Sequence, residues 1–201
     1  MNVEVKEAIE KRRSIRHFSP KPIEKNQLYE LVRIARLAPQ AANVQPLKFM
    51  IVHQKELLEP VFSCLKWAGY LPGYAPKTGY HPTAYIVILV DTDLKKQADT
   101  DAGLAAENLM LAAVGEGLGT CMLGAVDRVR LRKILGVPDN MDIHSVIALG
   151  YPAEDPVWEE KDSDSIKYYL DESGRLHVPK RRMNEILVTI HPDLSDEKES
   201  L

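Results

Sequence analysis

The sequence predicts a mixed α and β protein, in which helices and strands alternate along one globular domain. Residues 84–90 form a continuous apolar run that ends at Asp91, as expected of a strand buried on both faces. Leu28, Leu31 and Ala35 recur at the spacing of one helix face. Residues 1–194 show no internal repeat and no linker, so we expect a single domain, followed by a disordered acidic tail over 195–201.

Turn-forming residues divide the rest of the chain into further elements. Pro20 and Pro22 separate a first short helix from the helix around Leu31, and Pro39 closes that second helix. Glycines and prolines among aromatic residues predict an irregular loop over 69–82. The other expected elements, in chain order, are a helix ending at about Arg12, a strand over 47–53, a helix from about Lys55, strands over 120–123 and 145–149, and a helix over 127–135 that Gly136 ends.

The segment from Ala102 to Val114 predicts a helix that is apolar on nearly every side. Glu107 and Asn108 are its only polar members, so this helix has no polar face to expose to water and must be enclosed by protein. A domain of this size seldom wraps one helix in two layers, so we expect a second copy of the chain to cover it. After Gly150 the sequence turns acidic, and we expect that stretch to run over the surface.

Composition and charge narrow the class of protein. A net charge of -3 and a pI near 6.1 argue against nucleic-acid binding, and the longest apolar run is too short to cross a membrane. The N-terminal residues are charged and lack the apolar stretch of a signal peptide. Cys64 and Cys121 are the only cysteines, which fits a cytoplasmic protein without disulfides. The six histidines lack the spacing of a metal site, so we expect none.

Two basic clusters predict a site for a small anion. The run Arg12-Arg13-Ser14-Ile15-Arg16 places three guanidiniums and one hydroxyl at the end of the first expected helix, and Lys180-Arg181-Arg182 follows the rigid Pro179. Arginine suits phosphate because its planar fork offers several fixed donors and stays charged. In a chain of net negative charge, two such clusters are typical of two halves of one site. A solvated basic turn remains the alternative for each cluster.

Five motifs follow one another along the chain. They are Arg12-Arg13-Ser14-Ile15-Arg16, Ala38-Pro39-Gln40-Ala41-Ala42-Asn43-Val44-Gln45-Pro46, the apolar helix running into Gly117-Leu118-Gly119-Thr120-Cys121, Ala148-Leu149-Gly150-Tyr151-Pro152, and Pro179-Lys180-Arg181-Arg182. In this order and spacing the chain resembles the flavin-dependent nitroreductase family over essentially its whole length. The resemblance implies an α+β domain with a central, mainly antiparallel sheet flanked by helices. It also implies a domain-entwined homodimer with two FMN sites at the subunit interface.

The resemblance further implies roles for residues of the basic clusters. Arg12 and Ser14 match the phosphate and ribityl contacts of the family. A second phosphate contact falls within Lys180–Arg182, where Arg181 is the best match and its two neighbours are alternatives. Arg16 matches a cation beside the N1 and O2 edge of the flavin, where it stabilises the negative charge of the reduced ring.

Other parts of the predicted FMN site come from loops and a strand end. Asn43 and Gln45 match residues that reach the ring from the other subunit, and Leu123 and Gly124 lie where a backbone N–H meets flavin N5. Many relatives have serines before the Asn43 position and Trp at the Leu47 position, and this loss of hydroxyls weakens one polar edge of the site. The predicted cofactor-binding set is completed by Arg13, Pro39, Gln40 and Ala41.

The resemblance implies an FMN-dependent oxidoreductase that works in two half-reactions. NAD(P)H passes hydride to flavin N5 and leaves, and an electron-poor acceptor such as a nitroaromatic or a quinone then takes its place. No separate nicotinamide domain is visible, which fits one shared site and ping-pong kinetics. No side chain is assigned as catalytic, because flavin N5 carries the chemistry. The alternatives are a low-turnover FMN-binding or redox-sensing protein, and a dehalogenase or flavin-cleaving relative on the same fold.

Two further features have both a structural and a functional interpretation. Asn108 more readily ties its helix to a neighbour than binds flavin. The aromatic residues near the irregular loop either stack over the flavin or pack the loop itself; they are Trp67, Tyr70, Tyr74 and Tyr80. Neither the physiological acceptor nor the preference between NADH and NADPH follows from the sequence.

Overall fold

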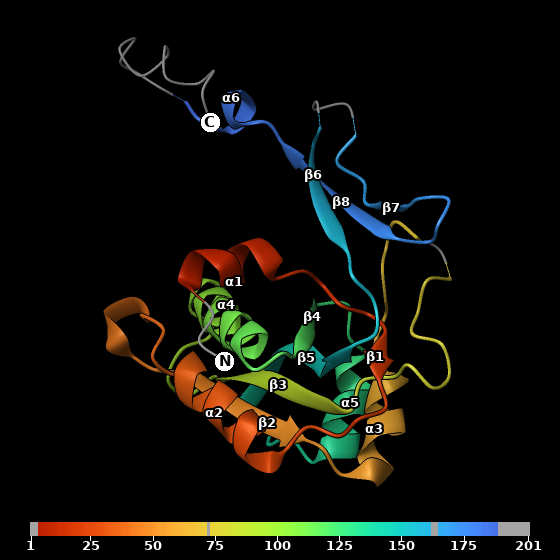
Figure 1. The fold of residues 1–201 in the computed structure, drawn as a ribbon. Coiled ribbons are helices and arrows are strands. Elements are labelled where there is room, and N and C mark those ends of the chain that lie inside the picture. The colour runs from red at the N-terminus through yellow and green to blue at the C-terminus, as the bar shows by residue number, and fades with distance from the viewer. Residues whose placement is uncertain (1–3, 72, 162–164, 189–201) are drawn as a thin grey trace. The chain divides into compact units, whose positions relative to one another are not determined.

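The computed structural model describes residues 4–71, 73–161 and 165–188, which fall into two compact units (Figure 1). The first unit extends to Glu154 and the second begins at Asp155. One domain over residues 1–194 therefore stays a prediction, and the tail expected at 195–201 lies outside the described residues. None of the described helices is long and apolar enough to cross a lipid bilayer.

The first unit is built on a five-stranded sheet with helices on both faces. Its elements, in chain order, are α1 (Val5–Lys11), β1 (Phe18–Ser19), α2 (Lys25–Ala35), the 3-10 turn η1 (Ala41–Asn43), β2 (Leu47–Val52), α3 (Lys55–Phe62), β3 (Ala84–Asp91), α4 (Asp99–Gly115), β4 (Gly119–Leu123), α5 (Arg128–Leu135) and β5 (Met141–Pro152). Four strands lie in the order β1-β5-β3-β2, and β4 also pairs with β5. All these pairings are antiparallel, which confirms the expected sheet.

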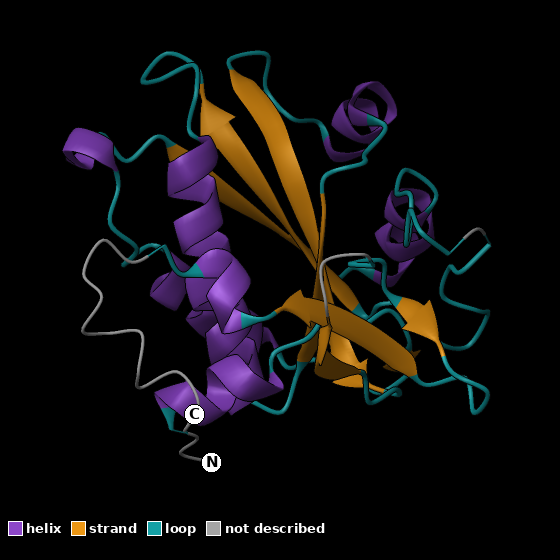
Figure 2. Cartoon of the chain, turned by 90° about the horizontal axis from the view of Figure 1, so that it is seen from above, coloured by secondary structure: helices purple, strands orange, loops and turns teal. Residues whose placement is uncertain are grey.

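Strand β3 lies inside this sheet, and its side chains alternate between two apolar layers. Ile86 and Ile88 pack with residues of α2 and α4, whereas Tyr85 and Val87 pack with residues of α3 and α5. Figure 2 shows the helices on both sides of the sheet. Every residue from Ala84 to Val90 is buried, which confirms the predicted strand. The apolar run is continuous because neither face of β3 meets water.

The helices begin and end close to the predicted residues. Asp127 precedes α5 and its carboxylate accepts the Arg130 N–H, while Gly136 ends the helix with a φ of 62° that suits glycine. Helix α4 begins at Asp99, three residues before the predicted start, so its first turn contains two acidic residues, Asp99 and Asp101. Negative side chains are favourable there because they face the positive end of the helix dipole.

Helix α4 is covered by the described protomer on one side only. Ala105, Leu109 and Ala113 are buried in the core that α2 and α4 share with the sheet. On the other side Leu104 is 42% exposed and Leu111 is only half-buried. The enclosure expected for this apolar helix is therefore incomplete within one protomer.

The second unit holds a three-stranded sheet, which the sequence analysis missed. Its elements are β6 (Val157–Lys161), β7 (Tyr169–Leu170), β8 (Leu176–Arg181) and the short helix α6 (Met183–Ile186). Strand β8 pairs with β6 in parallel and with β7 in antiparallel orientation. The acidic stretch that was expected to run over the surface enters β6 after β5 ends at Pro152, and Asp155, Trp158 and Glu160 are exposed there. There Glu159 accepts a hydrogen bond from the Tyr169 hydroxyl at 2.9 Å.

Candidate functional site

The basic run after α1 lies along strand β4. The Ile15 N–H donates to the Thr120 carbonyl at 2.8 Å, and Ser14 forms a parallel bridge with the same residue. After this bridge the chain leaves β4, because Phe18 pairs with Pro152 of β5, beyond the Gly119–Gly150 end of the ladder between β4 and β5. The structure thus brings Ser14 to the strand whose far end carries Leu123, although the two segments are about a hundred residues apart in sequence.

Two glycines allow this segment to lie so close to the sheet. Gly119 and Gly150 face each other in the ladder between β4 and β5. A Cβ on Gly119 would lie 2.8 Å from the Ile15 side chain, and one on Gly150 would lie 2.7 Å from the Phe18 side chain. Both distances are well below the contact distance of two carbon atoms. The glycine pair therefore makes room for Ile15 and Phe18, and these two anchors hold the segment between them.

We expect Gly150→Ala to lower the free energy of unfolding by about 1–3 kcal/mol, the usual cost of overpacking a core. Phe18 is completely buried and has no space into which to retreat. Urea denaturation measures the change. The control is Gly69→Ala, because a Cβ on Gly69 meets nothing within 4 Å. Equal stability of Gly150→Ala and the wild-type protein would contradict the close packing.

The three arginines of the run have different surroundings. Arg12 follows α1, and its Nε lies 3.2 Å from Glu107 Oε1 on α4. Arg13 turns back and donates to the Glu10 carbonyl at 2.6 Å, and burial, reinforced by the charge of Arg12, lowers the pKa of its guanidinium. Arg16 is only 9% exposed. Arg13 therefore caps the carbonyl end of α1 by a hydrogen bond, whereas Arg12 and Arg16 place positive charge on the segment beside β4.

Glu154 is a functional candidate that the sequence analysis missed. Its carboxylate accepts the backbone N–H of Arg16 and the hydroxyl of Tyr74, the latter at 2.8 Å, and lies 2.9 Å from His17 Nδ1. Burial, followed by the bond to Glu154, raises the pKa of Tyr74. Since Tyr74 belongs to the irregular loop over 69–82, Glu154 fastens that loop to the segment that carries Arg16.

The aromatic residues of this region mostly pack among themselves. The Trp67 ring lies 5.6 Å from that of Phe62, and the rings of Tyr74 and Tyr80 meet His17 edge-on at 5.2 and 6.0 Å. These contacts favour loop packing for the three residues, because the faces of Tyr74 and Tyr80 are fixed by their own neighbours.

The loop over 39–46 has an unusual backbone for its sequence. Ala42, Asn43 and Gln45 have φ values of 51°, 53° and 55°, although none is glycine. Each such residue costs on the order of 1–2 kcal/mol, and strain of this kind persists only where the surroundings impose it. The side chains of Asn43 and Gln45 are exposed in the described protomer. Strain in an exposed loop indicates a functional constraint, not a packing one.

A buried carboxylate holds this strained loop, and the sequence analysis missed it as well. Asp101 Oδ1 accepts the Ala41 N–H at 2.9 Å, and Lys95 Nζ donates to Oδ2 at 2.8 Å. The Asp101 side chain is 2% exposed. The hydrogen bond from Lys95, followed by that from Ala41, lowers the pKa of Asp101, so the carboxylate is charged at neutral pH.

The second basic cluster lies in the other compact unit. Lys180 and Arg181 end β8, and Arg182 precedes α6. All three side chains are exposed, and Arg181 Nη1 lies 3.3 Å from Glu185 Oε2. Successive strand residues point to opposite faces, so Lys180 and Arg181 are directed to different sides. Convergence of this cluster with Arg12 stays a prediction.

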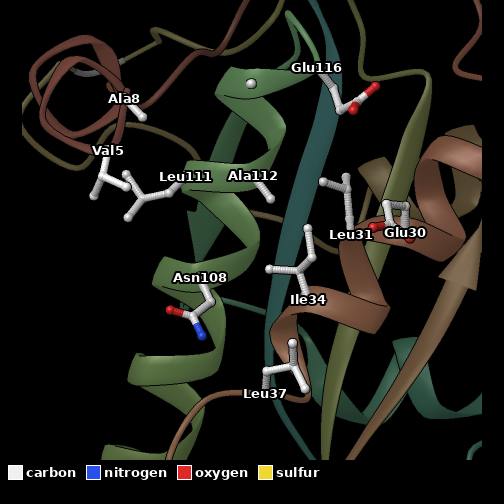
Figure 3. Close-up of a pocket in the computed structure, with 11 residues that line it drawn as sticks. Val5, Ala8, Glu30, Leu31, Ile34, Leu37, Asn108, Leu111, Ala112 and Glu116 are labelled. Atoms are coloured by element: carbon white, nitrogen blue, oxygen red, sulfur yellow. The ribbon is translucent and has the colours of Figure 1, made fainter. Parts of the chain in front are cut away.

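A groove of about 560 Å³ lies between α1, α2 and α4 (Figure 3). Leu111 of α4 points toward Val5 of α1 across one side of it. Most of its other lining residues are apolar and a few are polar; they are Ala8, Glu30, Leu31, Ile34, Leu37, Asn108, Ala112, Gly115 and Glu116. Val5 is 73% and Leu37 62% exposed, so this wall of the first unit presents a large apolar surface. Asn108 lies in the groove, on the outer side of α4.

The polar groups of the first unit fit an organic anion. Arg12, Ser14 and Arg16 offer donors of the kind that phosphate and carbonyl oxygens accept. Gln40 Oε1, on another loop, is buried and has no hydrogen-bond donor among the described residues, so it can accept a bond from an N–H of an organic ligand. Across the parts of the chain that the structure describes, no three His, Cys, Asp or Glu side chains gather as a metal ion requires.

A sequence model of the nitroreductase family matches residues 9–151 of the chain. The chain belongs to the nitroreductase family. The match includes three of the five motifs that carried the resemblance and all but Pro152 of a fourth, and the family predicted from the sequence is confirmed.

Known nitroreductases and their relatives resemble the chain in sequence and in fold. A protein of Archaeoglobus fulgidus, provisionally named NADH dehydrogenase/NAD(P)H nitroreductase, is 33% identical over an alignment of 159 residues, with 75% of this chain and 87% of that protein covered. The 4-nitrobenzoate reductase of Pseudomonas putida is 25% identical, with 71% and 83% covered. The solved FMN-dependent nitroreductase of Clostridium difficile R20291 has a TM-score of 0.63 at 27% identity, with 79% and 92% covered.

Proposed function

We propose that the chain is an FMN-dependent oxidoreductase that takes hydride from NAD(P)H and reduces an electron-poor acceptor such as a nitroaromatic or a quinone. Membership of the nitroreductase family supports this, as do relatives named 4-nitrobenzoate reductase and FMN-dependent nitroreductase. The observation that carries the proposal is that the segment with Arg12, Ser14 and Arg16 is fixed to β4, through Ser14 and Ile15 at Thr120. FMN, when bound, supplies an atom, N5, that accepts and returns hydride.

Different residues of the basic run would contact the phosphate and the ring of FMN. Arg12 would turn from Glu107 to the phosphate; the Arg12 side chain is 22% and that of Glu107 44% exposed, and a solvent-accessible ion pair contributes little stability. Arg16 is buried, so its charge acts through a low dielectric on negative charge at the ring edge. Ser14 adds a hydroxyl between them.

The end of β4 has room for the reactive edge of the ring. A Cβ placed on Gly124 would meet nothing within 4 Å, whereas Leu123 is buried and holds the strand in the core. A flat ligand can therefore approach the backbone at Gly124. This supports the predicted backbone contact at Leu123 and Gly124.

The functional unit would be a homodimer. Asn43 and Gln45 are exposed on a strained loop, so their amides are available to a second chain. The uncovered side of α4 and the groove beside it supply the large apolar surface that an obligate interface needs. A second copy of the chain satisfies both features at once.

A spectroscopic and kinetic assay tests the proposed activity. The purified protein should be yellow, or become so with FMN, and should oxidise NADH or NADPH rapidly when a nitroaromatic is added. Double-reciprocal plots at several acceptor concentrations should be parallel, as for two half-reactions at one site. Protein that stays colourless with FMN would overturn the proposal, and intersecting lines would contradict the shared site. Bound flavin without turnover would instead favour the binding or sensing alternative.

A further inference from the structure

Asp101 has no part in the contacts that the proposed function assigns to the cofactor. It is nevertheless buried, with a side chain 2% exposed, in the first turn of α4. A buried carboxylate is unfavourable unless hydrogen bonds compensate it. Here both oxygens are used: Oδ1 accepts the Ala41 N–H and Oδ2 accepts Lys95 Nζ. Asp101 therefore joins two loops that are distant in sequence.

The loop that Asp101 holds has few other constraints. Residues 41–45 are all exposed, and the internal hydrogen bonds run from the Asn43 N–H to the Gln40 carbonyl, from the Val44 N–H to the Ala41 carbonyl, and from Gln45 Nε2 to the Asn43 carbonyl at 3.4 Å. At the far end the Asp91 N–H donates to the Pro46 carbonyl at 2.8 Å. The loop is thus fixed at its two ends, by Asp101 at Ala41 and by strand β3 at Pro46. Between these anchors lie the three residues with positive φ.

We infer that Asp101 is a positioning residue, which holds the 40–45 loop in the left-handed conformation that presents Asn43 and Gln45 to the flavin of the second subunit. This inference rests on the proposed function for the statement that the amides of Asn43 and Gln45 contact flavin. The pair of hydrogen bonds that Asp101 makes with Ala41 and Lys95, here called the clamp, is observed directly. Lys95 completes the clamp, because it neutralises the buried carboxylate and fixes its second oxygen.

Asp101→Ala removes the acceptor of the Ala41 N–H, and Asp99→Asn is the matched control. Asp99 is in the same turn and carries the same charge, but its side chain is 85% exposed. We expect Asp101→Ala to speed hydrogen exchange of the Ala41 amide by roughly 10- to 100-fold in the absence of FMN, the effect of losing a bond to a charged group. FMN affinity should fall by a similar factor, and Asp99→Asn should change either quantity less than about twofold.

A rescue variant separates loop positioning from general stability. Glycine adopts a φ near 50° without strain, so Ala42→Gly added to Asp101→Ala should restore part of the FMN affinity. A variant that has lost only helix or core stability would gain nothing from this change. Should Asp101→Ala fail to fold, Lys95→Met leaves Asp101 in place, and it should raise the exchange rate of the Ala41 amide by several-fold.

The exchange measurement does not depend on the cofactor. If the wild-type protein binds no FMN, the proposed function fails, but faster exchange at Ala41 still supports the clamp. If the Ala41 amide exchanges in Asp101→Ala at the same rate as in the wild-type protein, the inference is overturned. Where Asp101→Ala is insoluble, the same result in Lys95→Met overturns it. Faster exchange with unchanged FMN affinity would overturn its link to the flavin.

Discussion

Leu111→Glu is expected to abolish the dimer and FMN binding together. Leu111 is half-buried on the outer side of α4 and lines the apolar groove next to Val5. A charge buried there without a partner weakens association by roughly 3–5 kcal/mol, or about 140- to 4,000-fold. Light scattering reports the oligomeric state, and flavin fluorescence the bound FMN. Both should fall in parallel, because a lone protomer offers only part of the proposed site.

Two other Glu variants show what a buried position and an exposed position should give. Leu109 lies on the same apolar helix, but it is completely buried in the core of its own protomer. Leu109→Glu should therefore prevent folding and cannot test the interface. Val129→Glu is the surface control, since Val129 is 71% exposed on α5. A soluble monomer, wild-type or Leu111→Glu, that still binds FMN would contradict the shared site.

The sequence predicted those features whose cause is local. The apolar run of β3 identifies a doubly buried strand because every residue in it is covered on both faces. Asp127 and Gly136 identify the ends of α5 because capping depends on neighbouring residues. The five motifs identified the family, and the antiparallel sheet that the resemblance implied is present.

The contacts that support the site could not be predicted, because their partners are far apart in sequence. Asp101 bonds to a residue 60 positions away, and Glu154 to a tyrosine 80 positions away. In the sequence, Asp101 resembles an ordinary acidic residue in a first helical turn, and Glu154 is one member of an acidic stretch. Strand β6 was missed for a related reason, since charged side chains interrupt its pattern and it depends on β8 for pairing.

Arg12→Ala is expected to weaken FMN binding by about 1.5–3 kcal/mol, which is roughly a 10- to 150-fold increase in Kd. The reason is the loss of a hydrogen bond to a charged phosphate. Equilibrium titration with FMN measures the change. Arg36→Ala is the control, because Arg36 is exposed at the end of α2 and should leave Kd unchanged.

Arg181→Ala should have an effect of the same size if the two basic clusters bind one phosphate. The two arginines would then share a ligand, so their effects on the free energy of FMN binding should not be additive. The loss in the double variant should differ from the sum of the two single losses. An Arg181→Ala protein that binds FMN as tightly as the wild-type would exclude Arg181 from the site, whatever Arg12→Ala shows. Lys180→Ala and Arg182→Ala then decide between its neighbours, of which Lys180 is directed by the alternation of β8 to the face opposite Arg181.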